Sequence, residues 1–90
     1  MELKLAFGQA IRNLRVSKKL SQETIGASQA YISDLERGIK SPSVIKLVEF
    51  AENMGVHPLT ILAKSYLLAN PELSIEELLE RVRRELEEEG

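Results

Sequence analysis

Apolar residues spaced three and four positions apart recur between the glycines and prolines of this chain, and this spacing favours a series of short helices. Phe7, Ala10, Ile11 and Leu14 set the pattern, which predicts an amphipathic helix over residues 3–17. No segment stands out as a strand, and no internal repeat is present. We therefore expect an all-α fold.

Two short helices are predicted next, separated by residues 26–28 (GAS). Ser21 is suited to cap a helix of a single turn that ends near residue 25. Ser28 is suited to cap the following helix, which we expect to end at Arg37, because Gly38 can adopt the left-handed conformation that terminates helices. The inward positions of this third helix are Ile32 and Leu35.

A fourth helix is expected between Pro42 and Gly55. Pro42 suits the first helical position behind Ser41, and Gly55 suits the end. Its apolar stripe is Val44, Leu47, Val48, Ala51 and Met54.

Two further helices complete the chain. Pro58 starts a fifth helix that runs to about residue 68, with His57 as its N-cap or a turn residue. Residues 70–72 (NPE) break the chain again, and residues 74–77 (SIEE) form a capping box that opens a sixth helix.

The net charge of −2 hides an uneven distribution. Residues 1–46 carry eight Lys and Arg against four acids, a net charge of +4, whereas residues 47–90 carry four against ten, a net charge of −6. The first part of such a chain can face a polyanion while the second part lies away from it.

Several classes of protein are excluded by composition. The absence of Cys excludes disulfide scaffolds, thiolate metal sites and cysteine nucleophiles, and it suits the cytoplasm. No stretch approaches the ~20 apolar residues of a membrane span, and charges interrupt the N-terminus too often for a signal peptide. No phosphate-binding glycine loop, metal-ligand spacing or activated nucleophile is found. We expect a cytoplasmic protein that is not an enzyme, binds no cofactor, metal or membrane, and shows no evident small-molecule ligand.

The third predicted helix has the side chains of a helix that reads DNA. A reading helix needs short hydrogen-bonding groups at its exposed N-terminal end, and Ser28, Gln29, Ala30 and Ser33 meet this need. The Gln29 carboxamide can form a bidentate pair with adenine, although a solvated surface residue is the simpler interpretation of Gln29 taken alone. Two short helices joined by a tight turn, the second with this face, predict a helix-turn-helix.

Several separated motifs resemble the Cro and lambda-repressor type, or XRE-type, helix-turn-helix family. They are residues 20–23 (LSQE), 27–38 (ASQAYISDLERG) and 41–43 (SPS), followed by Leu47, Ala51, Gly55 and Val56. The resemblance covers about residues 5–65 and implies a five-helix lambda-repressor-like domain, to which this chain adds a C-terminal sixth helix.

The resemblance implies roles for individual residues. Bases would be read by Ser28, Gln29, Ala30, Ser33 and Asp34, and phosphates would be bound by Gln22, Arg37, Lys40 and Ser43. Tyr31 either binds a phosphate through its hydroxyl or packs against the protein. Arg15 and Glu36 match a structural ion pair between the first and third helices.

The chain departs from the family pattern between Gln22 and the third helix. It has about four fewer residues there than common members, which is roughly one helical turn. The second helix is therefore expected to be a single turn anchored by Ile25, and its shortening affects the angle at which the third helix meets DNA.

The sixth helix lies outside the resemblance and carries one apolar stripe: Ile75, Leu78, Leu79, Val82 and Leu86. Such a stripe packs either within its own subunit or against the same helix of a second subunit. We favour a two-fold homodimer built from the fifth and sixth helices. Its two reading helices would lie ~34 Å apart and match a pseudo-palindromic operator with half-sites about 10 base pairs apart.

The sequence therefore predicts a helix-turn-helix domain over residues 1–70 and a dimerisation helix over residues 71–90. The leading hypothesis is a sequence-specific regulator of transcription that binds double-stranded DNA, with repression as the simplest outcome. The alternative is a protein-interaction module, resembling an antitoxin or antirepressor, that has kept the scaffold and lost DNA binding.

Overall fold

The chain folds into six helices and no strand within residues 1–26 and 28–89, which the computed structural model describes. In chain order they are α1 (Leu3–Ser17), α2 (Gln22–Ile25), α3 (Gln29–Glu36), α4 (Val44–Met54), α5 (Pro58–Ala69) and α6 (Ile75–Glu89). The all-α prediction is confirmed. Ala27, at the centre of the predicted turn between α2 and α3, lies outside the described residues.

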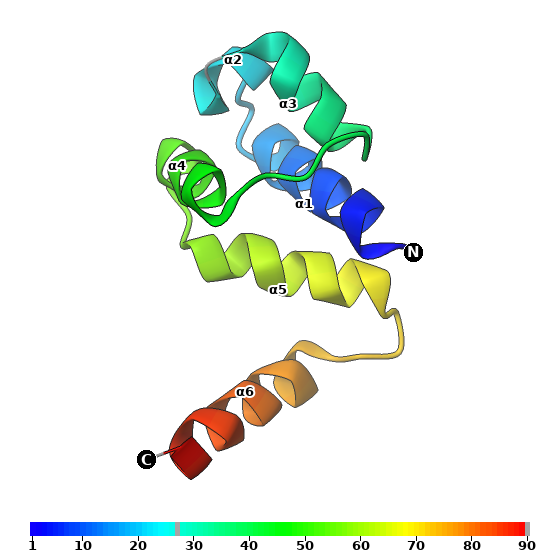
Figure 1. Ribbon diagram of the computed structural model, residues 1–90, viewed down its shortest axis with the longest axis vertical. Helices are drawn as coiled ribbons and strands as arrows, with labels where there is room; N and C mark the ends of the chain where they lie inside the picture. Colours follow the sequence, from blue (N-terminus) through cyan, green and yellow to red (C-terminus); the bar gives the residue numbers. More distant parts are fainter. Residues whose placement is uncertain (27, 90) are drawn as a thin grey trace.

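Helices α1 to α5 surround one core, and α6 lies apart from it (Figure 1). Helix α1 packs along α5 and α3, while α2 contacts α3 and α4. The buried side chains of the core are Ile11, Ile25, Ile32, Leu35, Leu47, Phe50, Ala51, Met54 and Ile61. The inward positions predicted for α3, Ile32 and Leu35, are both among them.

The close approach of α1 to α3 depends on Gly8. A β-carbon at this position would overlap the carbonyl oxygen of Leu35 and lie only 2.9 Å from that of Glu36. Because only glycine leaves this space open, the C-terminal end of α3 can rest directly on the backbone of α1.

The single turn of α2 is held in place from several sides. Its predicted anchor, Ile25, is fully buried, and Asn53 of α4 donates a hydrogen bond of 3.1 Å from Nδ2 to the Ile25 carbonyl. A β-carbon on Gly26 would overlap the side chain of Ile32 in α3. These contacts hold the backbone in place just before α3 begins, although α2 is too short to be stable by itself.

The start of α4 differs from the prediction. Pro42 is not its first residue: Ser43 caps the helix, accepting a hydrogen bond of 3.2 Å from the Lys46 amide, and the helix begins at Val44. Both Ser41 and Ser43 suit a cap, and the structure uses Ser43. Val44, which was expected to face the core, is instead 75% exposed, because the first residue of α4 in the core is Leu47, almost one turn further along.

The remaining helix ends follow the predicted chemistry. Gly55 adopts the left-handed conformation (φ 72°) that ends α4, and Gly38 adopts it (φ 77°) after α3. His57 caps α5, its Nδ1 accepting a hydrogen bond of 3.0 Å from the Leu59 amide.

Helix α6 begins with the predicted capping box. The Glu77 amide donates to Ser74 Oγ over 3.1 Å, and the Ser74 amide donates to Glu77 Oε1 over 3.2 Å. The helix follows an extended connection from α5, contacts α5, and buries none of its residues (Figure 1). No helix of the described chain is both long and apolar enough to cross a bilayer.

Candidate nucleic-acid interface

Helix α3 presents its predicted reading residues on the side opposite the core. Gln29 and Ala30 are exposed, and Ser33 and Asp34 are partly exposed. Since Ile32 and Leu35 bury the other side, the outward side chains of α3 contribute little to the core. A helix held from beneath with short polar groups outward can approach base edges closely.

Ser28 caps α3 at the end that would enter a groove. Its hydroxyl accepts a hydrogen bond of 3.3 Å from the Tyr31 amide. Acceptance leaves the hydroxyl hydrogen of the exposed Ser28 side chain available to donate outward.

The ion pair between Arg15 and Glu36 fastens α3 to α1. Arg15 Nε and Nη2 donate to the Glu36 carboxylate over 2.7 Å and 3.0 Å, and Nη1 donates to the Leu20 carbonyl over 2.8 Å. The side chains are only 14% and 5% exposed. The hydrogen bond to Glu36 raises the pKa of Arg15 above its ordinary value and outweighs the opposite effect of burial. This pair is the one that the family resemblance implied.

Gln22 belongs to the same network. Its Nε2 donates a hydrogen bond of 3.1 Å to Glu36 Oε1, which ties the start of α2 to the end of α3. The carboxamide has a second N–H, so this contact orients Gln22 and leaves one donor for a phosphate.

Tyr31, Asp34, Arg37 and Lys40 form a cluster at the C-terminal end of α3. The Tyr31 ring packs against Phe50 with centroids 6.3 Å apart, and Lys40 Nζ lies 5.4 Å from the Tyr31 centroid. Asp34 lies 3.5 Å from Lys40 Nζ and 3.9 Å from Arg37 Nη1. Neither contact of Asp34 was predicted from the sequence, although the i,i+3 spacing of Asp34 and Arg37 is a signal for one of the two.

Ser43 lies at the N-terminus of α4, three residues after Lys40. It is exposed, and its hydroxyl accepts from the Lys46 amide. Helix N-termini favour anions, which is compatible with the phosphate role expected for Ser43. Lys46 itself pairs with Glu49 over 3.3 Å.

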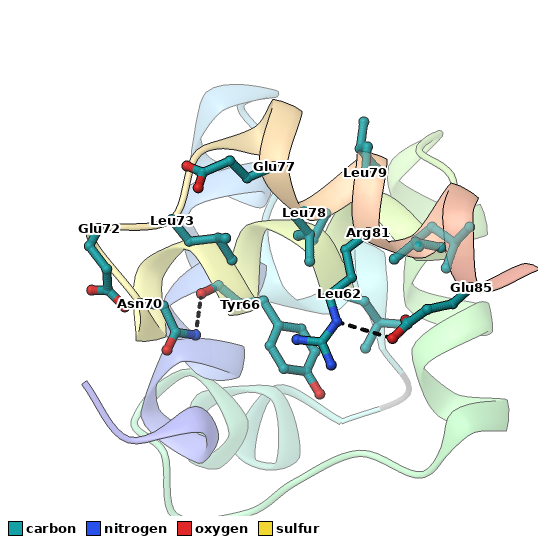
Figure 2. A pocket seen from close by; sticks show the side chains of 13 residues that line it. Leu62, Tyr66, Asn70, Glu72, Leu73, Glu77, Leu78, Leu79, Arg81 and Glu85 are labelled. Atoms are coloured by element: carbon teal, nitrogen blue, oxygen red, sulfur yellow. Dashed lines mark hydrogen bonds and ion pairs between the residues drawn. The ribbon is translucent and has the colours of Figure 1, made fainter.

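A second surface lies between α5 and α6. A groove of about 740 Å³ separates them, with Leu59, Leu62, Ala63 and Tyr66 on α5 and Leu78, Leu79 and Val82 on α6. Leu78 points toward Leu62 and Tyr66, and the Arg81–Glu85 ion pair (3.1 Å) lies at the edge (Figure 2). Four residues of the α6 stripe remain markedly exposed: Ile75 (38%), Leu79 (55%), Val82 (43%) and Leu86 (65%).

No group of three or more metal-ligating side chains converges anywhere in residues 1–26 and 28–89. The described chain therefore offers two candidate surfaces for function, the outward face of α3 and the α5–α6 groove.

The chain is similar to known helix-turn-helix proteins, among them regulators of transcription. A helix-turn-helix family model matches residues 11–61, which include α2 and α3 and end before α6. The chain is 42% identical over 60 residues to the uncharacterised HTH-type transcriptional regulator y4dJ of Sinorhizobium fredii, covering 62% of this chain and 78% of that protein. It is 35% identical over 65 residues to the control protein C.BamHI of Bacillus amyloliquefaciens, covering 67% and 80%.

Among solved structures, the restriction-modification controller protein C.AhdI from Aeromonas hydrophila has a similar fold. The TM-score is 0.60 with 31% sequence identity, and the match covers 63% of this chain and 92% of the other. A match of that extent leaves about a third of the present chain without a counterpart.

Proposed function

Because the chain belongs to the Cro and lambda-repressor-like family of helix-turn-helix transcriptional regulators, we propose that it binds double-stranded DNA sequence-specifically with α3 in the major groove. The observation that carries this proposal is the outward face of α3, where Gln29, Ala30 and Ser33 lie free of the core. This face has the side chains and the exposure that base contacts require.

The proposal divides the site into base-reading and phosphate-binding residues. Gln29 pairs with adenine through its carboxamide, Ser28 and Ser33 donate or accept at neighbouring bases, and Ala30 contacts a thymine methyl group. Phosphates are bound by Tyr31 within α3 and by residues on the segments that flank it: Gln22, Arg37, Lys40 and Ser43.

The distribution of charge supports this orientation. The basic half of the chain includes α3, and the acidic half includes α6. Helices α3 and α6 lie toward opposite ends of a molecule 41 Å long (Figure 1). DNA bound at α3 is therefore kept away from the acidic C-terminal helix, whose charge would repel it.

A second copy of this chain is the proposed occupant of the α5–α6 groove. The exposed α6 stripe adjoins two exposed side chains of α5, Leu59 (62%) and Tyr66 (43%), and forms one apolar surface with them. The rim carries both signs of charge in Arg81 and Glu85. A second copy related by a two-fold axis presents this pair in the opposite order, so that each arginine can face a glutamate.

Dimerisation would also set the geometry of the operator. Two recognition helices related by a two-fold axis fit half-sites about 10 base pairs apart on a pseudo-palindromic sequence. A dimer covering promoter DNA would block polymerase without further parts, which favours repression.

Selection of bound sequences from a random duplex library tests binding and half-site spacing together. The expected result is a two-fold symmetric sequence that the protein binds less tightly as salt rises, because each phosphate contact releases counterions. Absence of binding to any duplex at low salt would contradict the proposal.

The second candidate function is a protein-interaction module. The observation that favours it is the hydrogen bond that Gln22 donates to Glu36 beside a shortened α2. This bond uses one of the two N–H groups with which Gln22 would otherwise bind a DNA phosphate. A folded dimer that binds no DNA at low salt is the outcome that this candidate predicts.

A further inference from the structure

Asp34 holds the two cations at the C-terminal end of α3. Its Oδ2 lies 3.5 Å from Lys40 Nζ and its Oδ1 lies 3.9 Å from Arg37 Nη1. Its backbone carbonyl also accepts hydrogen bonds from the Ile39 and Lys40 amides, over 2.9 Å and 3.3 Å. The loop that carries Lys40 is thereby folded back onto Asp34. In the free protein the negative charge of this one carboxylate partly neutralises two side chains that are proposed to bind DNA phosphates, Arg37 and Lys40.

These ion pairs are easy to open. The side chains of Arg37 and Lys40 are 68% and 52% exposed, and ion pairs of this kind contribute little to stability because water screens them. A DNA phosphate can therefore take both cations from Asp34. The Asp34 carboxylate, which is 30% exposed, would then be left unpaired beside a polyanion.

The position of Asp34 gives that carboxylate one way to regain a partner. Asp34 follows Ala30 by one turn, at the edge of the outward face of α3, so its side chain can reach the floor of a groove that α3 occupies. In the major groove the amino group at N4 of cytosine donates to carboxylates, whereas the edge of guanine offers only acceptors. A cytosine at this position restores a hydrogen bond, and a guanine adds repulsion.

We propose that Asp34 is a specificity-determining residue that exchanges partners when the protein binds its operator. In the free protein it holds Arg37 and Lys40; at the operator these side chains bind phosphates and Asp34 accepts a hydrogen bond from a cytosine amino group. On other sequences Asp34 stays unpaired and weakens binding. This inference rests on the proposed function, which places α3 in the major groove.

The test compares the wild-type protein with Asp34→Ala on three kinds of duplex: the selected operator, operators with each base pair changed in turn, and random sequence. Asp34→Ala is expected to bind random duplex several-fold more tightly, because a negative charge near the phosphates is removed. It is also expected to lose a preference for cytosine at one position in each half-site. The ratio of operator to random affinity should fall by about tenfold.

Two further variants separate this exchange from simpler effects. Asp34→Asn keeps the shape of the side chain and an oxygen acceptor but removes the charge. It is expected to bind random duplex more tightly than the wild-type protein, so this readout remains available if the alanine variant does not fold. Lys40→Gln is the matched control at the other end of the ion pair, and it is expected to weaken operator and random duplex alike.

The outcomes distinguish the inference from the function it rests on. Unchanged base preference at every position in a folded Asp34→Ala protein, or unchanged affinity for random duplex in either folded Asp34 variant, would overturn the partner exchange while leaving DNA binding intact. Absence of any binding by the wild-type protein would overturn the proposed function itself.

Discussion

At the scale of single residues, the candidate reading face and the structure beneath it are carried by different side chains. Gln29 and Ala30 face outward, whereas Glu36, nearly two turns further along α3, is almost buried between Arg15 and Gln22. The two groups should therefore respond differently to substitution, one in base preference and the other in stability.

Gln29→Ala is expected to relax base preference at a single position of each half-site. Loss of a bidentate contact to adenine costs roughly 1–3 kcal/mol of discrimination there. Competition binding with single-base operator variants measures it. Affinity for random duplex should stay near that of the wild-type protein. An equal loss of affinity for the operator and for random duplex would show that Gln29 does not read a base.

Glu36→Ala is expected to lower the free energy of unfolding by roughly 1–3 kcal/mol, because it leaves the guanidinium of Arg15 without its main acceptor. Urea denaturation measures the change. Glu49→Ala is the matched control: Glu49 also pairs with a cation, Lys46, but both side chains are about half-exposed (50% and 46%), so about 0–1 kcal/mol is expected. Equal losses for the two variants would contradict a structural role of the Arg15–Glu36 pair.

At the scale of helices, the position of α3 depends on how closely α1 can approach it. Gly8 is the residue that permits this approach, and alanine would force the carbonyl groups of Leu35 and Glu36 away. The reading helix is therefore placed by a contact on its far side.

Gly8→Ala is expected to lower both the melting temperature and the affinity for DNA. The result is informative because alanine is the better helix former by about 1 kcal/mol, so propensity alone predicts the opposite change. Thermal unfolding and operator binding measure the two effects. Arg12→Ala, at an exposed position of the same helix, should leave the melting temperature nearly unchanged. A Gly8→Ala protein with a higher melting temperature than the wild-type protein would contradict this prediction, because α1 and α3 could then move apart without loss of stability.

The sequence predicted the helices better than the contacts between them. Boundaries followed from local chemistry: Ser28 and Ser74 as caps, Gly38 and Gly55 as left-handed ends, and Pro58 as a start. The error at Pro42 arose because the two serines on either side of it both suit a cap, and local chemistry does not choose between them.

Contacts that join distant parts of the chain left weaker signals in the sequence. Phe50 lay outside the apolar stripe predicted for α4, and Gly8 could not be distinguished from any other glycine in a helix. The Arg15–Glu36 pair came from the family resemblance, and nothing in the spacing of Gln22 indicated that it joins the same network. Side-chain partners of this kind are decided by packing, which a local pattern does not encode.

At the scale of the whole molecule, DNA binding and self-association are proposed to lie at opposite ends. Helix α6 carries four exposed apolar side chains and lies at the end of the molecule far from α3 (Figure 1). Substitutions there should alter assembly without touching the reading face.

The double variant Leu79→Glu, Val82→Glu is expected to convert the proposed dimer to a monomer, because two charges would replace apolar contacts at the centre of the proposed interface. Sedimentation equilibrium measures the mass, and circular dichroism confirms that the helices persist. Glu80→Gln, on the opposite side of α6, is the control and should stay dimeric. A dimer that survives the double substitution would place the interface elsewhere.

Spacing between half-sites should matter as much as their sequence. Insertion of about 5 base pairs at the operator centre turns the half-sites to opposite faces of the duplex, so a rigid two-fold dimer can engage only one of them. Gel-shift titration is expected to show a large loss of affinity, and insertion of a full turn is expected to recover part of it only if the dimer can stretch. Equal affinity for every spacing would indicate that the protein binds as a monomer.

The separation of the two sides of α3 has a consequence for how such a protein changes over time. The core side, Ile32 and Leu35, and the fastening residue Glu36 hold the helix whatever its outer residues are. Mutations at Gln29, Ala30 and Ser33 can therefore accumulate with little penalty in folding. A duplicated copy of the gene could acquire a new operator by drift through folded, stable intermediates, and lineages built on this scaffold are expected to diverge in their targets sooner than in their cores.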